Sequence, residues 1–213
     1  MTQLQRSNLR EQVLEVVRQA MVSGELRPGD IYSAAALATR LGVSSSPVRE
    51  ALLTLVDQGL LEPVRNRGYR VVAMSERDLD EIYEMRLLLE VPATLSAAAN
   101  AGPDDLARLD GLAGEIESAA SAGDVALFLE ADRRFHLDLL SLSGNGRLTA
   151  AIANLRDQTR LYGLEKLAEH GRLADSAREH REMLATVSAR DWARLEEQVR
   201  VHLEHIRADW ASG

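Results

Sequence analysis

The order of short elements in the first third of the chain constrains the fold most. Apolar residues recur every three or four positions in 34–41 and in 48–55, which predicts two short helices separated by Gly42. The run LLEPVRNRGYRVV (60–72) then predicts two extended segments joined by a tight turn at residues 66–68. The resulting order is helix, turn, helix and β-hairpin.

This order is that of a winged helix-turn-helix, whose second helix enters the major groove of DNA. Before these elements, apolar residues at helical spacing predict a further helix. It begins at Ser7, a candidate N-cap, and ends at Gly24. Hydroxyl groups at a helix start bind phosphates, and arginines bind phosphates or guanine edges. The candidate DNA-binding residues are Ser44, Ser45, Ser46, Arg49, Arg65, Arg67 and Gly68. The alternative that this pattern leaves open is ordinary helical packing, with Arg49 in a surface ion pair.

Charge divides the chain after the hairpin. Residues 1–74 carry nine arginines and seven acids, a net charge of +2, whereas residues 75–213 carry a net charge of −10. A basic segment suits a nucleic-acid partner, and an acidic one suits a separate, well-solvated domain. We therefore expect a DNA-binding domain at 1–74 and a second domain at 75–213.

The second part of the chain has helical periods and lacks strand signals. Ser75 and Asp78 resemble a capping box that begins the first helix, Pro92 is expected to kink or break it, and Pro103 begins the next. About six helices follow one another to the C-terminus, the fourth over residues 145–171. The pattern predicts an antiparallel helical bundle and a mainly α chain.

Several features bear on cellular location. The chain has no cysteine, no apolar run of the roughly 18 residues that a membrane span needs, and no apolar signal core near its start. These features predict a cytoplasmic protein with no membrane partner, no disulfides and no thiolate metal site.

Four polar residues lie at positions that predict burial in the bundle. Asp132 and His136 are four residues apart and share one helix face with apolar residues such as Leu139. His180 and His202 also neighbour apolar residues. A carboxylate and neutral imidazoles suit a divalent first-row metal, and bundle cores hold such sites. On spacing alone, satisfied core or surface residues remain the alternative.

The segments VSGELRPGD and LATRLGVSSSPVREALLTLVDQGLLEPVRNRGYRVV resemble the N-terminal domain of GntR-family bacterial transcription regulators, over about residues 8–73. Two departures concern the DNA contacts. Family members often have an arginine where this chain has Ser45, and a charged residue where its second helix reads SAAALA. The resemblance implies a winged helix-turn-helix, and we expect a homodimer that binds an inverted-repeat operator.

The segments IYEMRLLLE, ADRRFHLDLLSLSGN, EHREMLATV and ARLEEQVRVHLEHI resemble the helical FCD domain of the FadR subgroup, over about residues 78–209. Six helices favour its shorter VanR-like variant. The resemblance implies one divalent metal held by Asp132, His136, His180 and His202. We expect zinc first, because imidazole suits it and it is redox-inert, and nickel or manganese would also accept this set. It also implies a small carboxylate effector near Arg86 and Asn145, although Asn145 also suits the N-cap of the next helix.

The expected function is a ligand-responsive transcription repressor, and the expected role of 75–213 is effector binding and dimerisation. The first alternative is a metal-dependent enzyme built on the bundle. No HExxH, P-loop, nucleophile-elbow or paired-glutamate motif is present, and Asp132 as a ligand leaves no evident base, so no catalytic residue is predicted. The second alternative is a DNA-binding protein without an effector, which leaves the four-ligand set unexplained.

Overall fold

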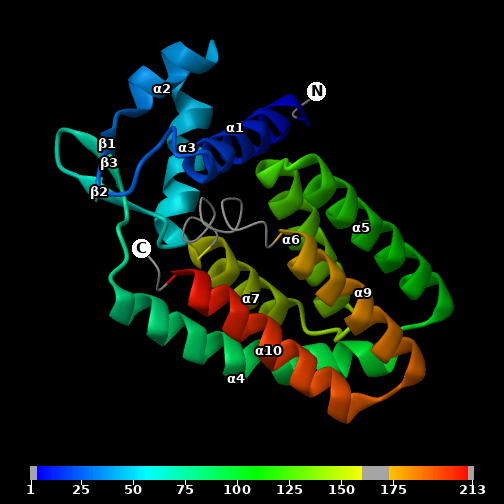
Figure 1. Ribbon diagram of the computed structural model, residues 1–213. Helices are drawn as coiled ribbons and strands as arrows, with labels where there is room; N and C mark the ends of the chain where they lie inside the picture. Colours follow the sequence, from blue (N-terminus) through cyan, green and yellow to red (C-terminus); the bar gives the residue numbers. More distant parts are fainter. Residues whose placement is uncertain (1–3, 160–172, 211–213) are drawn as a thin grey trace. The chain divides into compact units, whose positions relative to one another are not determined.

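The computed structural model describes residues 4–159 and 173–210 (Figure 1). The chain divides into two compact units, Met1–Met74 and Ser75–Gly213. Each unit buries its own apolar side chains, for example Leu55 in the first and Phe135 in the second. Among the described helices, none has both the length and the apolar character needed to cross a membrane.

The first unit is a winged helix-turn-helix. Its described elements are α1 (Leu4–Val22), β1 (Ile31–Tyr32), α2 (Ala34–Leu41), α3 (Ser45–Asp57), β2 (Leu61–Val64) and β3 (Gly68–Val71). Helix α3 packs against α1 and α2, with Val48, Leu52 and Leu55 buried. These side chains lie at three- and four-residue intervals, so they form one apolar face. The predicted order of helix, turn, helix and hairpin is confirmed.

The wing is a three-stranded antiparallel sheet rather than a hairpin alone. Strand β3 lies between β1 and β2, and Tyr69 pairs with Tyr32 on one side and with Pro63 on the other. Gly68 begins β3 with a φ of 130°, and a Cβ there would lie 2.3 Å from the carbonyl oxygen of Tyr32. Glycine therefore allows β1 to approach β3 closely.

Serine and glycine define the ends of the short helices. Ser33 Oγ accepts a hydrogen bond from the N–H of Ala36 at 3.1 Å and caps α2, which ends at Gly42 in the left-handed conformation. Helix α1 begins at Leu4, so the prediction that Ser7 is its N-cap is wrong. The residues just before Ser7 include glutamine and arginine, which favour helix, and the helix extends through them.

The second unit consists of helices in its described part. They are α4 (Glu76–Asn100), α5 (Pro103–Ala122), α6 (Val125–Ser141), α7 (Gly146–Thr159), α9 (Leu173–Ala189) and α10 (Trp192–Trp210). Helix α5 packs against α6 and α9, and α10 packs against α4 and α9 (Figure 1). The predicted mainly α fold is confirmed. The expected continuation of the fourth helix through residue 171 lies outside the described residues beyond Thr159.

Helix α4 begins with a capping box and continues through a proline. Ser75 Oγ accepts from the N–H of Asp78, and the Asp78 carboxylate accepts from the N–H of Ser75 at 2.8 Å. Pro92 lies inside the helix, so the break, one of the two outcomes predicted for it, does not occur. The kink stays a prediction. Pro92 and Leu88 are both exposed, so water can bond the Leu88 carbonyl that Pro92 leaves without a donor.

Candidate functional site

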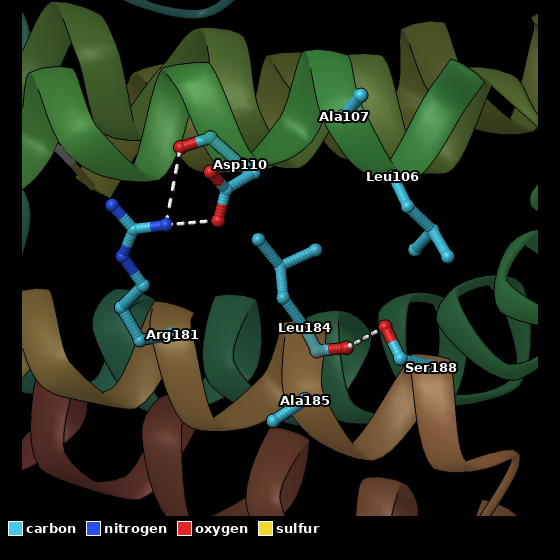
Figure 2. A pocket seen from close by; sticks show the side chains of 7 residues that line it. All are labelled: Leu106, Ala107, Asp110, Arg181, Leu184, Ala185 and Ser188. Atoms are coloured by element: carbon cyan, nitrogen blue, oxygen red, sulfur yellow. Dashed lines mark hydrogen bonds and ion pairs between the residues drawn. The ribbon is translucent and has the colours of Figure 1, made fainter. Parts of the chain in front are cut away.

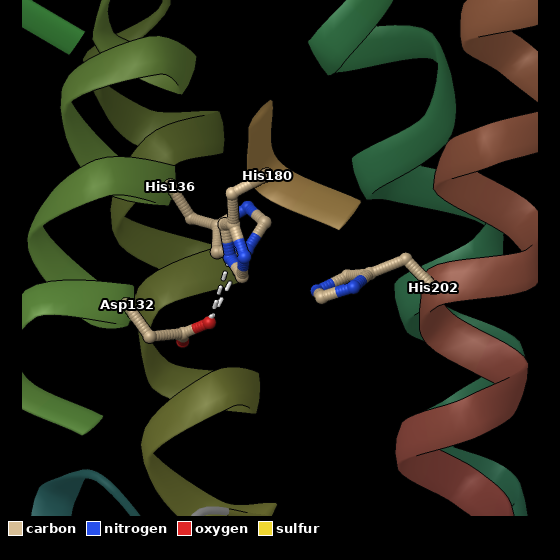
Figure 3. A group of neighbouring side chains, drawn as sticks. All are labelled: Asp132, His136, His180 and His202. Atoms are coloured by element: carbon tan, nitrogen blue, oxygen red, sulfur yellow. Dashed lines mark hydrogen bonds and ion pairs between the residues drawn. The ribbon is translucent and has the colours of Figure 1, made fainter. Parts of the chain in front are cut away.

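Four residues that the sequence singles out meet inside the second unit (Figure 3). Helix α6 carries Asp132 and His136, α9 carries His180, and α10 carries His202. One ligand atom from each of the four lies within 4.8 Å of the other three. His180 is 0% exposed and His202 is 2% exposed, so these two rings are shielded from bulk water.

The polar atoms of this cluster face one another. His180 Nε2 lies 3.1 Å from Asp132 Oδ1 and 3.1 Å from His136 Nε2. His136 Nε2 lies 3.5 Å from Asp132 Oδ1. The centres of the three imidazole rings are between 5.0 and 5.1 Å apart. Small side-chain adjustments would bring all four ligand atoms to the roughly 2.0–2.2 Å at which nitrogen and oxygen bind zinc.

Hydrogen-bond acceptors determine which ring nitrogen carries the hydrogen in His180 and in His202. His180 Nδ1 donates to the carbonyl oxygen of Ser176 at 2.7 Å, and His202 Nδ1 donates to Glu179 Oε2 at 2.6 Å. A carbonyl or an ionised carboxylate can only accept, so the neutral rings have their lone pairs on Nε2. Nε2 is therefore the atom that each ring offers to the cluster.

One of these lone pairs has no partner in the part of the chain that the structure describes. His202 Nε2 is buried and makes no hydrogen bond to any described residue. A buried polar atom without a partner costs about 1–3 kcal/mol of folding free energy. A cation at the centre of the cluster would accept this lone pair together with those of His180, His136 and Asp132. The donor set, one carboxylate and three imidazoles, fits a divalent metal.

The charge states of the cluster residues also suit a divalent metal. Burial raises the pKa of Asp132, but the neighbouring imidazoles and Arg156 outweigh it and lower that pKa well below its usual value. Burial and the Arg156 cation lower the pKa of His136 well below its usual value, and burial lowers the pKa of His202. At neutral pH the cluster therefore offers the Asp132 carboxylate and the neutral rings of His136 and His202, the forms that bind metals.

A buried chain of charges adjoins the cluster. Glu90 accepts hydrogen bonds from Arg86 Nε at 2.5 Å and from Arg156 Nη1 at 2.6 Å. Arg156 Nη2 also donates to Asp132 Oδ2 at 3.1 Å. Arg86 completes its contacts with a 3.4 Å hydrogen bond to Thr159 Oγ1. Arg86, the predicted effector residue, is thus buried near the cluster and already bound to a carboxylate.

Sequence reasoning gives no role to Glu90, Arg156 and Glu179. Glu90 lies four residues after Arg86, a spacing at which opposite charges pair on a helix. Their ion pair could therefore have been predicted from the sequence. Glu179 directly precedes a candidate ligand but faces a different helix. Arg156 has no local signal, because both its carboxylate partners lie on other helices.

Asn145 lies at the start of α7 and is exposed. Its Oδ1 accepts a hydrogen bond from the N–H of Leu148 at 3.1 Å, as an N-cap does. This capping role is the alternative that the sequence offers for Asn145. Its contact with an effector stays a prediction.

The candidate DNA-contacting side chains lie on the surface of the first unit. The exposed residues among them are Ser44, Ser45, Ser46, Arg49, Arg65 and Arg67. Ser46 Oγ donates to Glu50 Oε1 at 3.1 Å, and Arg70 on the wing donates to Glu62 at 2.6 Å. Exposed hydroxyls at the start of α3 and exposed cations at the wing are the groups that bind a phosphate backbone.

A surface pocket of about 480 Å³ lies between α5 and α9 (Figure 2). Its cationic side chain, Arg181, is paired with Asp110 and donates to Glu117 at 2.9 and 3.0 Å. Ser188 Oγ donates to the carbonyl oxygen of Leu184 at 3.0 Å. Because two carboxylates pair with Arg181, the positive charge of this pocket is already neutralised.

A winged helix-turn-helix followed by a helical domain defines a class of two-domain DNA-binding regulators. Comparison with known families agrees: residues 9–71 match the gntR family of bacterial regulatory proteins, and residues 81–205 match the FCD domain. The chain therefore belongs to the GntR family of transcription regulators, in its FadR-type subgroup with an FCD domain. The resemblance seen in the sequence is confirmed.

The relatives support this assignment. The HTH-type transcriptional regulator McbR of Escherichia coli (strain K12) is 31% identical over 182 residues, which cover 84% of this chain and 82% of McbR. The solved structure of E. coli McbR/YncC matches with a TM-score of 0.85 and 29% identity, over 96% of this chain and 97% of that chain. The E. coli (strain K12) repressor GlaR is 30% identical over 193 residues, or 86% of this chain and 87% of GlaR.

The family and these relatives are transcriptional regulators and not enzymes. The prediction that the chain is not an enzyme is therefore confirmed. FCD domains can bind a metal, and one solved relative is described as the metal-free FCD domain of TM0439. It matches with a TM-score of 0.51 and 25% identity, over 64% of this chain and 94% of that chain. All four residues of the cluster lie within the matched FCD region.

Proposed function

We propose that this chain is a ligand-responsive transcription repressor that depends on a bound metal. It binds an inverted-repeat operator as a homodimer through its winged helix-turn-helix. A small carboxylate bound at the metal in the helical unit changes the affinity for DNA. The observation that carries the proposal is the convergence of four ligand atoms within 4.8 Å, with the buried His202 Nε2 lacking a partner among the described residues.

The metal is held by Asp132, His136, His180 and His202. Zinc is the first candidate because imidazole ligands suit it, and nickel and manganese accept the same set. One carboxylate and three imidazoles leave positions for further oxygen ligands on the ion. When bound, the metal supplies a positive centre that attracts the carboxylate of an effector.

Arg86 is the second group proposed to receive the effector. Arg86 is 2% exposed, and its guanidinium donates to Glu90 at 2.5 Å through Nε and at 3.4 Å through Nη2. An effector carboxylate can form paired hydrogen bonds with the guanidinium of Arg86 only if Arg86 breaks these bonds to Glu90. Effector binding would therefore rearrange Glu90, which also holds Arg156.

The proposed DNA contacts follow from the exposed face of the first unit. Ser44, Ser45 and Ser46 present hydroxyls at the start of α3, and Arg49 follows one turn later. One such helix reads few base pairs, so paired heads on two half-sites supply the specificity. Repression as the outcome is supported by GlaR, a relative named as a repressor.

Metal analysis of untagged protein tests the sensor. The parent should hold about one divalent ion per chain after incubation with zinc. His180→Ala should lose most of this metal, because it removes a fully buried ligand from the centre of the cluster. Glu182→Ala is the control, since Glu182 is exposed on the same helix α9 and lies outside the four-residue cluster. Well under one ion per chain in the parent, with zinc, nickel and manganese all tried, would remove the metal site.

Band-shift titration on the DNA upstream of the chain's own gene tests the regulator. A thermal-shift screen of small carboxylates on the zinc-loaded protein first identifies a stabilising acid. That acid should change the operator affinity of the parent and leave the affinity of His180→Ala unchanged. Sedimentation of the protein–DNA complex should give two chains per operator. An acid that changes both proteins equally would place the effector away from the metal.

A further inference from the structure

Glu179 connects two histidines of α10 through its two carboxylate oxygens. His202 Nδ1 donates to Oε2 at 2.6 Å, and His205 Nδ1 donates to Oε1 at 2.6 Å. His202 is buried, Glu179 is partly buried and His205 is exposed. The carboxylate therefore has both oxygens engaged and little freedom to rotate.

The geometry of His202 depends on this carboxylate. An ionised carboxylate accepts only, so it fixes the hydrogen of His202 on Nδ1 and leaves the lone pair on Nε2. Nε2 is the buried atom that lacks a partner among the described residues. In metal proteins a carboxylate that holds the far nitrogen of a ligand histidine sets the tautomer and the orientation of the ring.

We propose that Glu179 is a positioning residue of the metal centre: it orients His202 and fixes its Nε2 lone pair toward the ion. The inference rests on the metal site proposed above. Helix α9 then serves the metal twice, because His180 reaches toward α6 while its neighbour Glu179 holds a ligand of α10. His205 completes the arrangement by holding the second oxygen of Glu179.

Zinc affinity is the direct measurement, by competition against a chromophoric chelator with the full chain. Glu179→Ala should lower the affinity by roughly 10–100-fold, the usual effect of losing such a partner. Glu179→Gln should lose less, because its amide oxygen still accepts from His202 Nδ1. Glu182→Ala is the matched control, an exposed glutamate three residues further along α9, and it should bind zinc as the parent does.

The visible spectrum of the cobalt-substituted protein is a second measurement. It would not change if Glu179 only stabilised the fold. The visible spectrum of Co²⁺ responds to the direction of each ligand, so it should change in Glu179→Ala and stay close to that of the parent in Glu179→Gln. Thermal unfolding of the metal-free variants identifies any that do not fold. Because Gln preserves the size and one acceptor, Glu179→Gln remains informative even if Glu179→Ala fails to fold.

A metal-free readout separates this inference from the proposed function. Nitrogen-15 spectra of the histidine rings should place the hydrogen of His202 on Nδ1 in the parent and on Nε2 in Glu179→Ala. A parent that binds no zinc would overturn the proposed metal site, and this inference with it. A parent that binds zinc, with Glu179→Ala equal to it in affinity and cobalt spectrum, would overturn the role of Glu179 alone.

Discussion

Asp132 divides its two carboxylate oxygens between two kinds of partner. Oδ1 lies 3.1 Å from His180 Nε2 in the cluster, and Oδ2 accepts a hydrogen bond from Arg156 at 3.1 Å. Oδ1 is therefore the oxygen of Asp132 that faces the cluster and that would be offered to a metal there. The carboxylate is thus held in one orientation before any ion arrives, which lowers the entropy cost of binding.

Glu90 is the residue whose loss should destabilise the second unit most clearly. It is 3% exposed and is shared by the buried guanidinium groups of Arg86 and Arg156. We expect Glu90→Gln to lower the free energy of unfolding by about 3–5 kcal/mol at pH 7, since two buried cations lose their anion. Glu81→Gln, an exposed change on the same helix, should cost at most about 0.5 kcal/mol. Urea titrations measure both.

The pH dependence of the Glu90 effect follows from its pKa. Burial raises the pKa of Glu90, but Arg86 and Arg156 outweigh it and lower that pKa from 4.5 to about 2. Because the pKa is lower in the folded state, the ionised carboxylate stabilises the fold above pH 4.5, and this stabilisation is lost as the pH falls toward 2. The difference between the parent and Glu90→Gln should narrow over this range. A constant difference would show that the charge of Glu90 is not the cause.

Two arginines of the first unit should affect DNA binding differently. Arg49→Ala should weaken specific binding by roughly 1–3 kcal/mol, because an arginine one turn into α3 can reach a base edge. Arg67→Ala, at the wing, should weaken binding to all sequences and reduce the salt dependence by about one phosphate contact. Band shifts on operator and random DNA at several salt concentrations separate the two. Unchanged operator affinity in Arg49→Ala would remove it from base reading.

At the residue scale, the sequence predicts side chains better than their partners. Asp132 and His136 could be grouped because their spacing alone places them on one helix face. His180 and His202 joined them through resemblance, since nothing local joins three helices. The role of Arg156 could not be predicted for the same reason. Its ion pairs with Glu90 and Asp132 form only where α4, α6 and α7 meet.

At the element scale, the wing depends on one glycine. An alanine Cβ at position 68 would lie 2.3 Å from the carbonyl oxygen of Tyr32 and 3.0 Å from the Cα of Ser33. We expect Gly68→Ala to separate β1 from β3, to destabilise the first unit and to weaken DNA binding. Urea unfolding and band shifts measure the two effects.

Gly29→Ala is the control for the effect of backbone conformation. Gly29 also has a positive φ, of 87°, but among the described residues other than its two chain neighbours no atom lies within 4 Å of the position that a Cβ would take there. The substitution should therefore cost only the conformational penalty of about 1–2 kcal/mol. Equal effects of the two substitutions would show that the contact with Tyr32 is unimportant.

Elements were predictable where a long period or a strong terminator exists. Gly123 ends α5 and Ser75 caps α4 as the sequence indicates. Strand β1 has two residues, too few to show alternation, and it exists only because β3 pairs with it. The continuation of α4 through Pro92 could not be predicted, because the position of Pro92 on an exposed face, where water can replace the lost donor, is a tertiary property.

At the scale of the whole molecule, the two units should respond separately to metal. The proposed ligands all lie in Ser75–Gly213, so zinc bound by them would stabilise only that unit directly. At a free zinc concentration of 100 times the dissociation constant, the gain is about 2.7 kcal/mol. Calorimetry should show one transition that rises with zinc and one that does not. His180→Ala should abolish the rise, and an equal rise in both transitions would contradict independent units.

The adjacency of Glu179 and His180 on α9 has an evolutionary consequence. Successive side chains of a helix point about 100° apart, so Glu179 and His180 contact different neighbouring helices although they lie in the same turn. The same helix buries Met183, Leu184 and Val187. Inserting or deleting one residue between His180 and Met183 would turn the pair away from its partners while the buried side chains stay in place. Lineages that descend from this sequence should therefore vary in length at the turn around Asp191 and keep residues 179–187 free of insertions and deletions.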